Sequence, residues 1–430
     1  MSKAGASCSA CSPVFPPSAE KESARCRRAG QNVADHDVIE SREAYFSAIE
    51  ALAGGTGPIG IDAERASGFT YSQRAYLIQI YRRDAGTFLF DPPAVGDFSE
   101  LNEALLDEEW ILHAASQDLA CLREVGLDPV SMFDTELAAR LLGLPRVGLG
   151  TVVEELLGIH LAKEHSAANW STRPLPEAWL VYAALDVELL PDLRDRMVEL
   201  LVEADKTHIA AEEFAAVLAR ETKAARTDPW RRLSGVHSIR GQRNLAVARE
   251  LWLARDALAQ RLDVSPGRLV PDASLVAAAR VMPESRQALA DLREFSGRAS
   301  RSELDRWWAA IQAGATTSDL PALKASTDTL PPPRAWAERN PEADVRFKAA
   351  RAALTAVSEE LAIPLENLLT PDFLRRVAWA PPEPVTPDSI GFALGELGAR
   401  AWQIDATAQL IADAFVEVRQ TIDLPSESDS

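Results

Sequence analysis

The stretch Ile59-Gly60-Ile61-Asp62-Ala63-Glu64 decides the fold and the site of this chain. Its apolar and polar residues alternate, which predicts a buried β-strand whose successive side chains point to opposite faces. Asp62 and Glu64 therefore share one face. Two carboxylates side by side on a core strand repel each other and lose hydration, unless a cation balances them. An edge strand with solvated acids is the alternative, and Ile59 and Ile61 argue for burial instead.

A third acid follows another apolar strand, predicted at 110–114. This strand runs into a helix predicted at 116–125. Ser116 is the expected N-cap of that helix, which puts Asp118 in its first turn. Taken alone, Asp118 is better explained as a partner of the helix dipole, which is the commoner role of an acid in a first helical turn.

A tyrosine and a fourth acid lie on a later helix. Pro176 is placed to begin this helix, which is predicted to continue to about residue 204. Tyr182 and Asp186 are four residues apart and so share one helical face. Singly, Tyr182 reads as a core aromatic residue and Asp186 as a solvated acid.

Together, in this order, these residues form a motif set. Asp-x-Glu, then Asp after His-Ala-x-Ser-x, then Tyr-x3-Asp resembles the DEDDy 3′→5′ exonucleases, and among them the ribonuclease D family. The likeness covers about residues 40–200. Four flanking runs also match the family: Ala75–Ile80, Phe90–Pro92, Phe133–Thr135 and Asn169–Leu175. The resemblance implies an α/β ribonuclease-H-like domain with a mixed sheet flanked by helices, which agrees with the alternating strand and helix signals of residues 34–222.

The chemistry of phosphodiester hydrolysis suits these residues. Two divalent cations about 4 Å apart can stabilise the attacking and leaving oxygens and activate water. Mg²⁺ and Mn²⁺ prefer carboxylate and water ligands, whereas zinc prefers His and Cys. We expect four metal ligands: Asp62, Glu64, Asp118 and Asp186. By resemblance, Asp62 bridges two metal ions and Tyr182 orients the attacking water, since a phenol is a poor base near pH 7.

Four other polar or aromatic residues lie near the motifs. Gln79 faces inward on the second strand, where it is expected to support the site. His113 is interpreted as a satisfied histidine at a strand end. Trp170 and Arg173 either meet the substrate or pack locally, and the sequence leaves both alternatives open.

Length and composition bound the class of protein. The chain has 430 residues, of which 47% are hydrophobic and 25% charged, typical of a soluble globular protein of two to four domains. It has neither a stretch of eighteen apolar residues nor an apolar signal-peptide region near its start, so we expect a cytoplasmic protein without a membrane span. Cys8, Cys11, Cys26 and His36 could form a zinc site, but their surroundings predict a disordered tail.

The remainder of the chain changes character after residue 222. Helical patterns resembling an HRDC domain follow, with breaks at 265–267 and 282–283. A second helical region, broken at 380–384, resembles a further HRDC domain. The expected organisation is a tail at 1–33, the exonuclease domain at 34–222, an HRDC domain at 223–312, a proline-rich linker at 313–344, a second HRDC-like domain at 345–420 and an acidic tail at 421–430.

Charge is distributed unevenly along the chain. The net charge is −19, and residues 34–222 carry 14 basic and 34 acidic side chains. Residues 223–310 carry 16 basic and 10 acidic side chains, which makes them the expected phosphate-binding segment. The densest group is Arg231, Arg232, Arg240 and Arg243. The alternative is that these arginines are solvated or pair with the acids of the segment.

The resemblance implies a metal-dependent 3′→5′ exoribonuclease that releases 5′-mononucleotides from RNA, with tRNA precursors as the expected substrate. The sequence does not reveal the oligomeric state, and we expect a monomer. A DNA 3′→5′ exonuclease is a rival within the same chemistry. A nucleic-acid-binding protein with an inactive nuclease fold is a rival from another class. The complete set of four acids and one tyrosine argues against the inactive protein.

Overall fold

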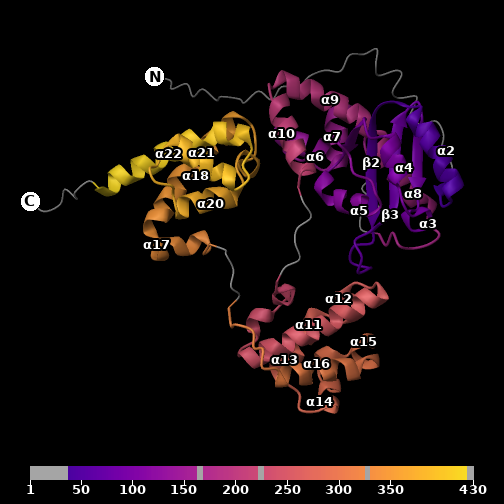
Figure 1. Cartoon of the computed structure of the whole chain (residues 1–430), viewed down its shortest axis with the longest axis vertical. Helices are drawn as coiled ribbons and strands as arrows, with labels where there is room; N and C mark the ends of the chain where they lie inside the picture. The colour runs from indigo at the N-terminus through magenta and orange to yellow at the C-terminus, as the bar shows by residue number, and fades with distance from the viewer. Residues whose placement is uncertain (1–36, 162–167, 221–226, 325–329, 424–430) are drawn as a thin grey trace, which may run out of the picture. The chain divides into compact units, whose positions relative to one another are not determined.

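The computed structural model describes residues 37–161, 168–220, 227–324 and 330–423 (Figure 1). The predicted disordered tail and the zinc alternative at Cys8, Cys11, Cys26 and His36 lie outside the described residues. No helix within the described ranges is both long enough and apolar enough to cross a membrane.

Within the described residues, six strands form one mixed sheet in the order β1-β4-β3-β2-β5-β6. Strand β2 pairs antiparallel with β3 and parallel with β5, so the opening stretch lies inside the sheet. The predicted mixed sheet is confirmed. The bounds are β1 (Val38–Ile39), β2 (Thr56–Arg65), β3 (Ala75–Arg83), β4 (Gly86–Phe90), β5 (Glu109–Leu112) and β6 (Ser131–Asp134). The edge strands β1 and β6 were not predicted, because such short segments show no clear alternation.

Helices pack against this sheet. Their bounds are α2 (Arg42–Ala53), α3 (Pro92–Val95), α4 (Ser99–Ala104), α5 (Leu119–Glu124), α6 (Thr135–Leu141), α7 (Leu149–Leu157), α8 (Glu177–Glu188), α9 (Leu190–Glu203) and α10 (Thr207–Leu218). Ile59 and Ile61 are buried on one face of β2, in a core that includes Tyr45 of α2. On the other face, a Cβ atom at Gly60 would lie 2.6 Å from the carbonyl oxygen of Val187 in α8. Glycine therefore allows α8 to approach β2 closely.

Two helix boundaries differ from the prediction. Ser116 is exposed inside a 3₁₀ turn, η1 (Ala115–Gln117), so the expected N-cap is wrong and Asp118 itself occupies the N-cap position of α5. The predicted long helix is divided at Leu189 into α8 and α9. Pro191 lies in the first turn of α9, where its missing N–H leaves no hydrogen bond unmade.

The segment after residue 226 is helical. Its elements are η2 (Pro229–Arg232), η3 (Val236–Ser238), α11 (Gln242–Leu262), α12 (Pro266–Leu269), α13 (Asp272–Val281), α14 (Arg286–Ala290), η4 (Arg293–Phe295), α15 (Arg298–Ser302) and α16 (Leu304–Thr316). Trp230, Phe295 and Trp307 belong to its buried core. The predicted breaks fall between α11 and α13 and at Met282, which adopts a left-handed backbone conformation.

The last helical part begins inside the segment 313–344 that was expected to be a linker. Its elements are η5 (Pro333–Ala335), α17 (Trp336–Arg339), α18 (Pro341–Glu360), α19 (Leu365–Leu368), α20 (Pro371–Trp379), α21 (Pro387–Glu396) and α22 (Ala401–Asp423). The prolines at 333 and 341 stand at the starts of helices, where an N–H group has no intrahelical partner. Proline therefore marks helix starts here as well as breaks, and the predicted gap at 380–384 lies between α20 and α21.

Candidate metal centre

Three carboxylates from two distant segments of the chain meet at the surface of β2. Asp62 and Glu64 come from β2, and Asp186 comes from α8. One oxygen atom from each of these side chains lies within 4.8 Å of the others. Strand alternation puts the first two on one face, and the close approach of α8 at Gly60 brings the third to them.

Asp118 adjoins this group from the start of α5. Its carboxyl group lies close enough to that of Asp62 for the charge of Asp62 to raise the pKa of Asp118. Asp118 also lies beside Arg65, with 3.4 Å between its Oδ1 and the arginine Nη2. All four predicted acids are therefore brought together, although Asp118 is not one of the three whose oxygens share the 4.8 Å cluster.

Burial and mutual repulsion raise the pKa values of these acids. Loss of hydration is the first cause, and neighbouring carboxylates add to it, so the pKa of Glu64 rises to about 10 and that of Asp118 to about 8. The pKa of Asp186 rises to about 7 for the same reasons, and burial also raises that of Asp62. Cations compete with protons for these oxygens, so a bound cation would take the place of the protons. All four donors are carboxylates, which are the ligands that hard divalent cations such as Mg²⁺ or Mn²⁺ prefer.

Tyr182 lies one helical turn before Asp186, and its hydroxyl group hydrogen-bonds to that carboxylate. Burial, followed by the charge of Asp186, raises the pKa of the phenol well above its ordinary value. Tyr182 therefore remains a neutral phenol near pH 7. It can donate and accept hydrogen bonds at the site but cannot act there as a phenolate base.

Gln79 contacts the acids from the neighbouring strand. It is paired with Asp62 across β2 and β3, and its Nε2 donates to Asp62 Oδ2 at 3.0 Å. The side chain is fully buried, and its Oε1 has no hydrogen-bond partner among the described residues. The support expected from the sequence takes the form of this direct hydrogen bond, which fixes the rotamer of Asp62.

Asp134 holds the turn that precedes Asp118, a role that the sequence did not reveal. Its buried carboxylate accepts hydrogen bonds from four backbone N–H groups at 2.9–3.1 Å, two in that turn and two in the first turn of α6. The turn includes Ala114, whose φ of 61° is unusual for a residue other than glycine. The available signal was an Asp at a helix start within the matching run at 133–135.

Trp170 and Arg173 both make local packing contacts. Trp170 is fully buried, and its ring centroid lies 5.2 Å from that of Trp179 on α8. The Arg173 guanidinium donates to Asp91 Oδ2 at 2.6 Å and to three backbone carbonyl groups, one of which belongs to Tyr76. These contacts fasten the segment before α8 to strands β3 and β4.

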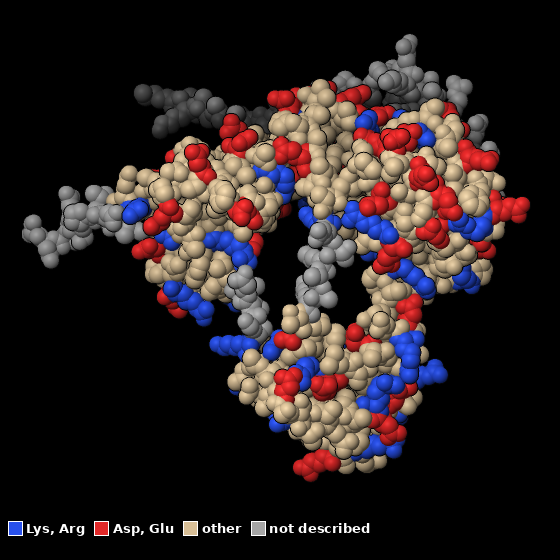
Figure 2. All heavy atoms as spheres, in the orientation of Figure 1, with Lys and Arg blue, Asp and Glu red and all other residues tan. Residues whose placement is uncertain are grey.

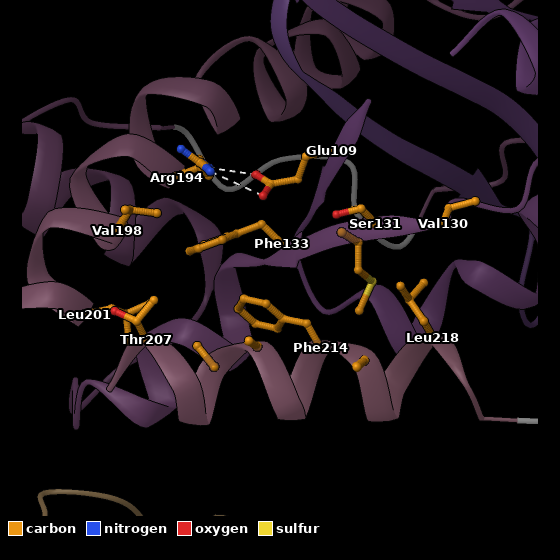
Figure 3. A pocket seen from close by; sticks show the side chains of 14 residues that line it. Glu109, Val130, Ser131, Phe133, Arg194, Val198, Leu201, Thr207, Phe214 and Leu218 are labelled. Atoms are coloured by element: carbon orange, nitrogen blue, oxygen red, sulfur yellow. Dashed lines mark hydrogen bonds and ion pairs between the residues drawn. The ribbon is translucent and has the colours of Figure 1, made fainter. Parts of the chain in front are cut away.

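A cavity of about 340 Å³ lies elsewhere in this domain, between β6, α9 and α10 (Figure 3). Its lining is largely apolar and includes Phe133 and Phe214. The one acid among its lining residues, Glu109, pairs with Arg194 at 2.7 Å and is not free to bind a cation. None of the five predicted site residues lines this cavity.

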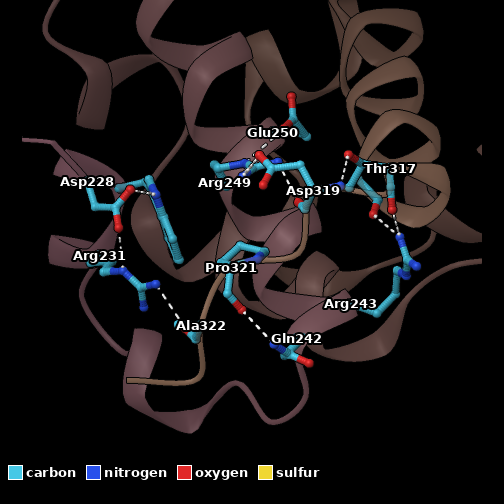
Figure 4. A network of polar contacts seen from close by, with 12 residues as sticks. Asp228, Arg231, Gln242, Arg243, Arg249, Glu250, Thr317, Asp319, Pro321 and Ala322 are labelled. Atoms are coloured by element: carbon cyan, nitrogen blue, oxygen red, sulfur yellow. Dashed lines mark hydrogen bonds and ion pairs between the residues drawn. The ribbon is translucent and has the colours of Figure 1, made fainter. Parts of the chain in front are cut away.

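The arginines of the segment 227–324 are of two kinds. Arg231 pairs with Asp228 and donates to the carbonyl of Ala322, and Arg243 donates to the carbonyls of Gly314 and Thr317 (Figure 4). The side chains of these two arginines are bonded within the fold. The expectation of phosphate binding therefore applies to the other two members of the group and not to all four.

The other two members of the group, Arg232 and Arg240, are exposed, and no described residue forms a hydrogen bond or ion pair with either side chain. In the view of Figure 2, further blue side chains gather along one edge of the part that contains α11–α16. Exposed guanidinium groups remain available to phosphates.

Three family models match the chain. The model "3'-5' exonuclease" matches residues 37–202, "HRDC domain" matches 244–311 and "3' to 5' exonuclease C-terminal domain" matches 329–415. The match at 244–311 confirms the HRDC resemblance for the middle segment. The second HRDC-like domain stays a prediction, since the last segment matches a model of another description.

Curated relatives and solved structures agree with these models. Ribonuclease D of Gluconacetobacter diazotrophicus is 34% identical over 246 residues, which are 55% of this chain and 61% of that protein. Ribonuclease D of Escherichia coli (strain K12) is 31% identical over 341 residues, 78% of this chain and 87% of the relative. Its crystal structure, titled as an exoribonuclease involved in structured RNA processing, has a TM-score of 0.65 at 26% identity and covers 90% of this chain and 99% of that one.

A crystal structure of a protein from Bifidobacterium adolescentis is more similar, with a TM-score of 0.81 at 36% identity. It covers 89% of this chain and 97% of that chain. The similarity to both structures therefore extends through the helical parts as well as the sheet. The acid cluster, the three matched models and the extent of the likeness to Escherichia coli ribonuclease D lead to one conclusion: the chain belongs to the ribonuclease D family of metal-dependent 3′→5′ exoribonucleases.

Proposed function

We propose that Asp62, Glu64, Asp118 and Asp186 hold two divalent cations and form the catalytic site of an exoribonuclease. The observation that carries this proposal is the meeting of three carboxylate oxygens within 4.8 Å, from β2 and α8. Asp118 adjoins the cluster beside Asp62. When bound, Mg²⁺ or Mn²⁺ would stabilise negative charge on the attacking and leaving oxygens and lower the pKa of water.

The side chains of the site have distinct roles in this proposal. Gln79 holds Asp62 in one rotamer through the 3.0 Å hydrogen bond. The Tyr182 hydroxyl hydrogen-bonds to Asp186, which places it beside the acid cluster, where it can contact the attacking water. Tyr182 thus orients the water and does not remove its proton. The products are 5′-mononucleotides, released one at a time from the RNA 3′ end.

We further propose tRNA precursors as substrates, because tRNA 3′ processing is the activity that the family resemblance implies. The likeness to a structure titled as acting in structured RNA processing supports a folded RNA with an accessible 3′ end. A cytoplasmic location and a monomeric state stay predictions.

The test is digestion of RNA carrying a 5′ label, with Mg²⁺, with Mn²⁺ and with a chelator. A 3′-extended tRNA is compared with single-stranded DNA of the same length. We expect stepwise shortening of the RNA from its 3′ end, mononucleotide products, and loss of activity with the chelator. Faster digestion of the DNA would favour the rival DNA exonuclease.

The matched variants are Asp62→Asn and Asp107→Asn, the second of which alters an exposed acid outside the cluster. Asp62→Asn should abolish cleavage and leave the fold intact, because removing one of several repelling charges does not destabilise the metal-free protein. Asp107→Asn should digest RNA at the wild-type rate. Wild-type turnover by Asp62→Asn in Mg²⁺ would disprove the assignment of the site.

A further inference from the structure

Arg65 follows directly after the two acids of β2, and its side chain reaches the acid cluster. Strict alternation would point Arg65 away from Glu64, toward the face where Ile61 is buried. The register of β2 against β3 is irregular at the step from Glu64 to Arg65, where the pairing skips Tyr76 of β3. At this end of β2 the guanidinium lies 3.4 Å from Asp118.

The position of Arg65 gives it two possible partners. Its positive charge lowers the pKa values of Asp62, Glu64 and Asp118, against the larger effect of burial. Its side chain is 26% exposed, whereas that of Asp118 is 9% exposed, so an incoming ligand can reach the guanidinium. The distance of 3.4 Å is longer than a good charge-assisted hydrogen bond, so the pair leaves room for a closer partner.

Loading of the acids with divalent cations changes what Arg65 faces. Two divalent cations balance the charge of the four carboxylates, so the attraction that holds a guanidinium at Asp118 falls. An RNA phosphate brings negative charge to the same place. A guanidinium suits phosphate because its planar array of N–H groups can bind two oxygens at once.

We propose that Arg65 is a substrate-binding residue that contacts a phosphate near the RNA 3′ end, and that in the metal-free protein it is the counter-ion of Asp118. This inference rests on the proposed function and adds a residue outside the predicted set of four acids and one tyrosine.

The test compares Arg65→Gln with Arg196→Gln. Arg196 is a matched control because it also pairs with a carboxylate, that of Glu199, and its side chain is 34% exposed. Arg65→Lys serves as a second variant that keeps the charge and loses the planar fork. Unfolding temperatures of all three variants show whether each one folds.

The first measurement is Mn²⁺ binding without RNA, followed by the electron paramagnetic resonance signal of free Mn²⁺. Arg65→Gln should bind Mn²⁺ at least about threefold more tightly than wild type, because a neighbouring positive charge has been removed and Asp118 is released. Arg65→Lys and Arg196→Gln should bind it like wild type. Unchanged or weaker Mn²⁺ binding by Arg65→Gln would overturn the counter-ion role.

The second measurement is single-turnover digestion of an RNA oligonucleotide over a range of protein concentrations. The half-saturating concentration should rise about tenfold in Arg65→Gln, the effect of one charged hydrogen-bonding contact. A single neutral methylphosphonate linkage, moved along the last nucleotides, should weaken binding to wild type at one position and have no further effect on Arg65→Gln.

The two proposals fail in distinguishable ways. If wild type shortens RNA and Arg65→Gln has the half-saturating concentration of Arg196→Gln, the phosphate contact of Arg65 is wrong and the proposed function stands. If wild type leaves every RNA intact in Mg²⁺ and in Mn²⁺, the proposed function and the RNA contact both fall. The Mn²⁺ measurement then still decides the role of Arg65 as counter-ion.

Discussion

At the scale of single residues, the role proposed for Tyr182 is the most specific of the site. Replacement of Tyr182 by Phe removes one hydroxyl group and keeps the ring in place. The loss of one positioned hydrogen bond in a transition state typically costs on the order of 10²–10³ in rate. We expect single-turnover cleavage to slow by this factor with little change in RNA affinity. An unchanged rate would leave Tyr182 as a packing residue.

His113 is a half-buried histidine outside the acid cluster. The Thr135 hydroxyl donates to the carbonyl of Leu112, so its oxygen accepts the His113 Nδ1–H at 2.9 Å. Burial lowers the pKa of His113 to about 4, while the nearby charges of Glu136 and Arg140 act in opposite directions. This agrees with the sequence-based interpretation of a satisfied histidine at a strand end.

This depressed pKa predicts a pH dependence of stability. Between pH 6.5 and about 4, the unfolded chain binds a proton at His113 that the folded chain does not bind. The contribution of His113 to stability is therefore present above pH 6.5 and is lost as the pH falls through this window. His113→Gln should flatten the fall in unfolding free energy by up to about 1.4 kcal/mol per pH unit. Urea unfolding at pH 7 and pH 4.5 measures the difference, and parallel curves for variant and wild type would refute it.

At the scale of elements, the approach of α8 to β2 sets the geometry of the acids. A Cβ atom at Gly60 would lie 2.6 Å from the backbone oxygen of Val187, the neighbour of Asp186. Backbone atoms cannot move aside as a flexible side chain can, so α8 itself must shift. Asp62 and Asp186 would then separate.

Gly60→Ala should therefore lower both stability and cleavage. We expect a loss of about 1–3 kcal/mol in unfolding free energy from overpacking, and slower single-turnover cleavage because Asp186 is displaced. Gly148→Ala is the matched control, since a Cβ atom at Gly148 would meet nothing within 4 Å. Wild-type cleavage by Gly60→Ala would show that the spacing of α8 and β2 is not critical.

At the scale of the whole molecule, the catalytic domain and the helical segment that follows it differ in the sign of their net charge. The excess of acidic residues at 34–222 repels RNA phosphates everywhere except at the metal site. Of the four arginines singled out in the next segment, Arg232 and Arg240 are exposed, whereas Arg231 and Arg243 are bonded within the fold. The exposed pair is the better candidate for phosphate contact.

A double variant, Arg232→Gln with Arg240→Gln, should weaken tRNA binding and make it less sensitive to salt. Each lost phosphate contact lowers the slope of log affinity against log salt by about 0.7–0.9. The variant Arg231→Gln with Arg243→Gln removes the same charge and should lower stability more than it changes the slope. Binding across a salt series in the presence of a chelator measures both. Equal slopes for wild type and the first variant would mean that these arginines only solvate the helices.

Much of the sheet and of the acid cluster followed from local patterns. Alternation at 59–64 determined that Asp62 and Glu64 share a face, and helical spacing placed Tyr182 beside Asp186. Such patterns are properties of neighbouring residues, so they are legible in the chain itself. The four-residue strand β6 and the 3₁₀ turn before Asp118 were not predicted, because segments of this length carry no period.

Only the tertiary structure decided which polar side chains form hydrogen bonds or ion pairs within the fold. It shows that Asp134 fixes the turn before Asp118, that Arg173 fastens the segment before α8, and that Arg65 pairs with Asp118. These contacts join segments that are far apart in the chain, and their geometry depends on how the strands and helices pack. The sequence determined which residues could bind a metal or a phosphate, and packing determined which of them are free to do so.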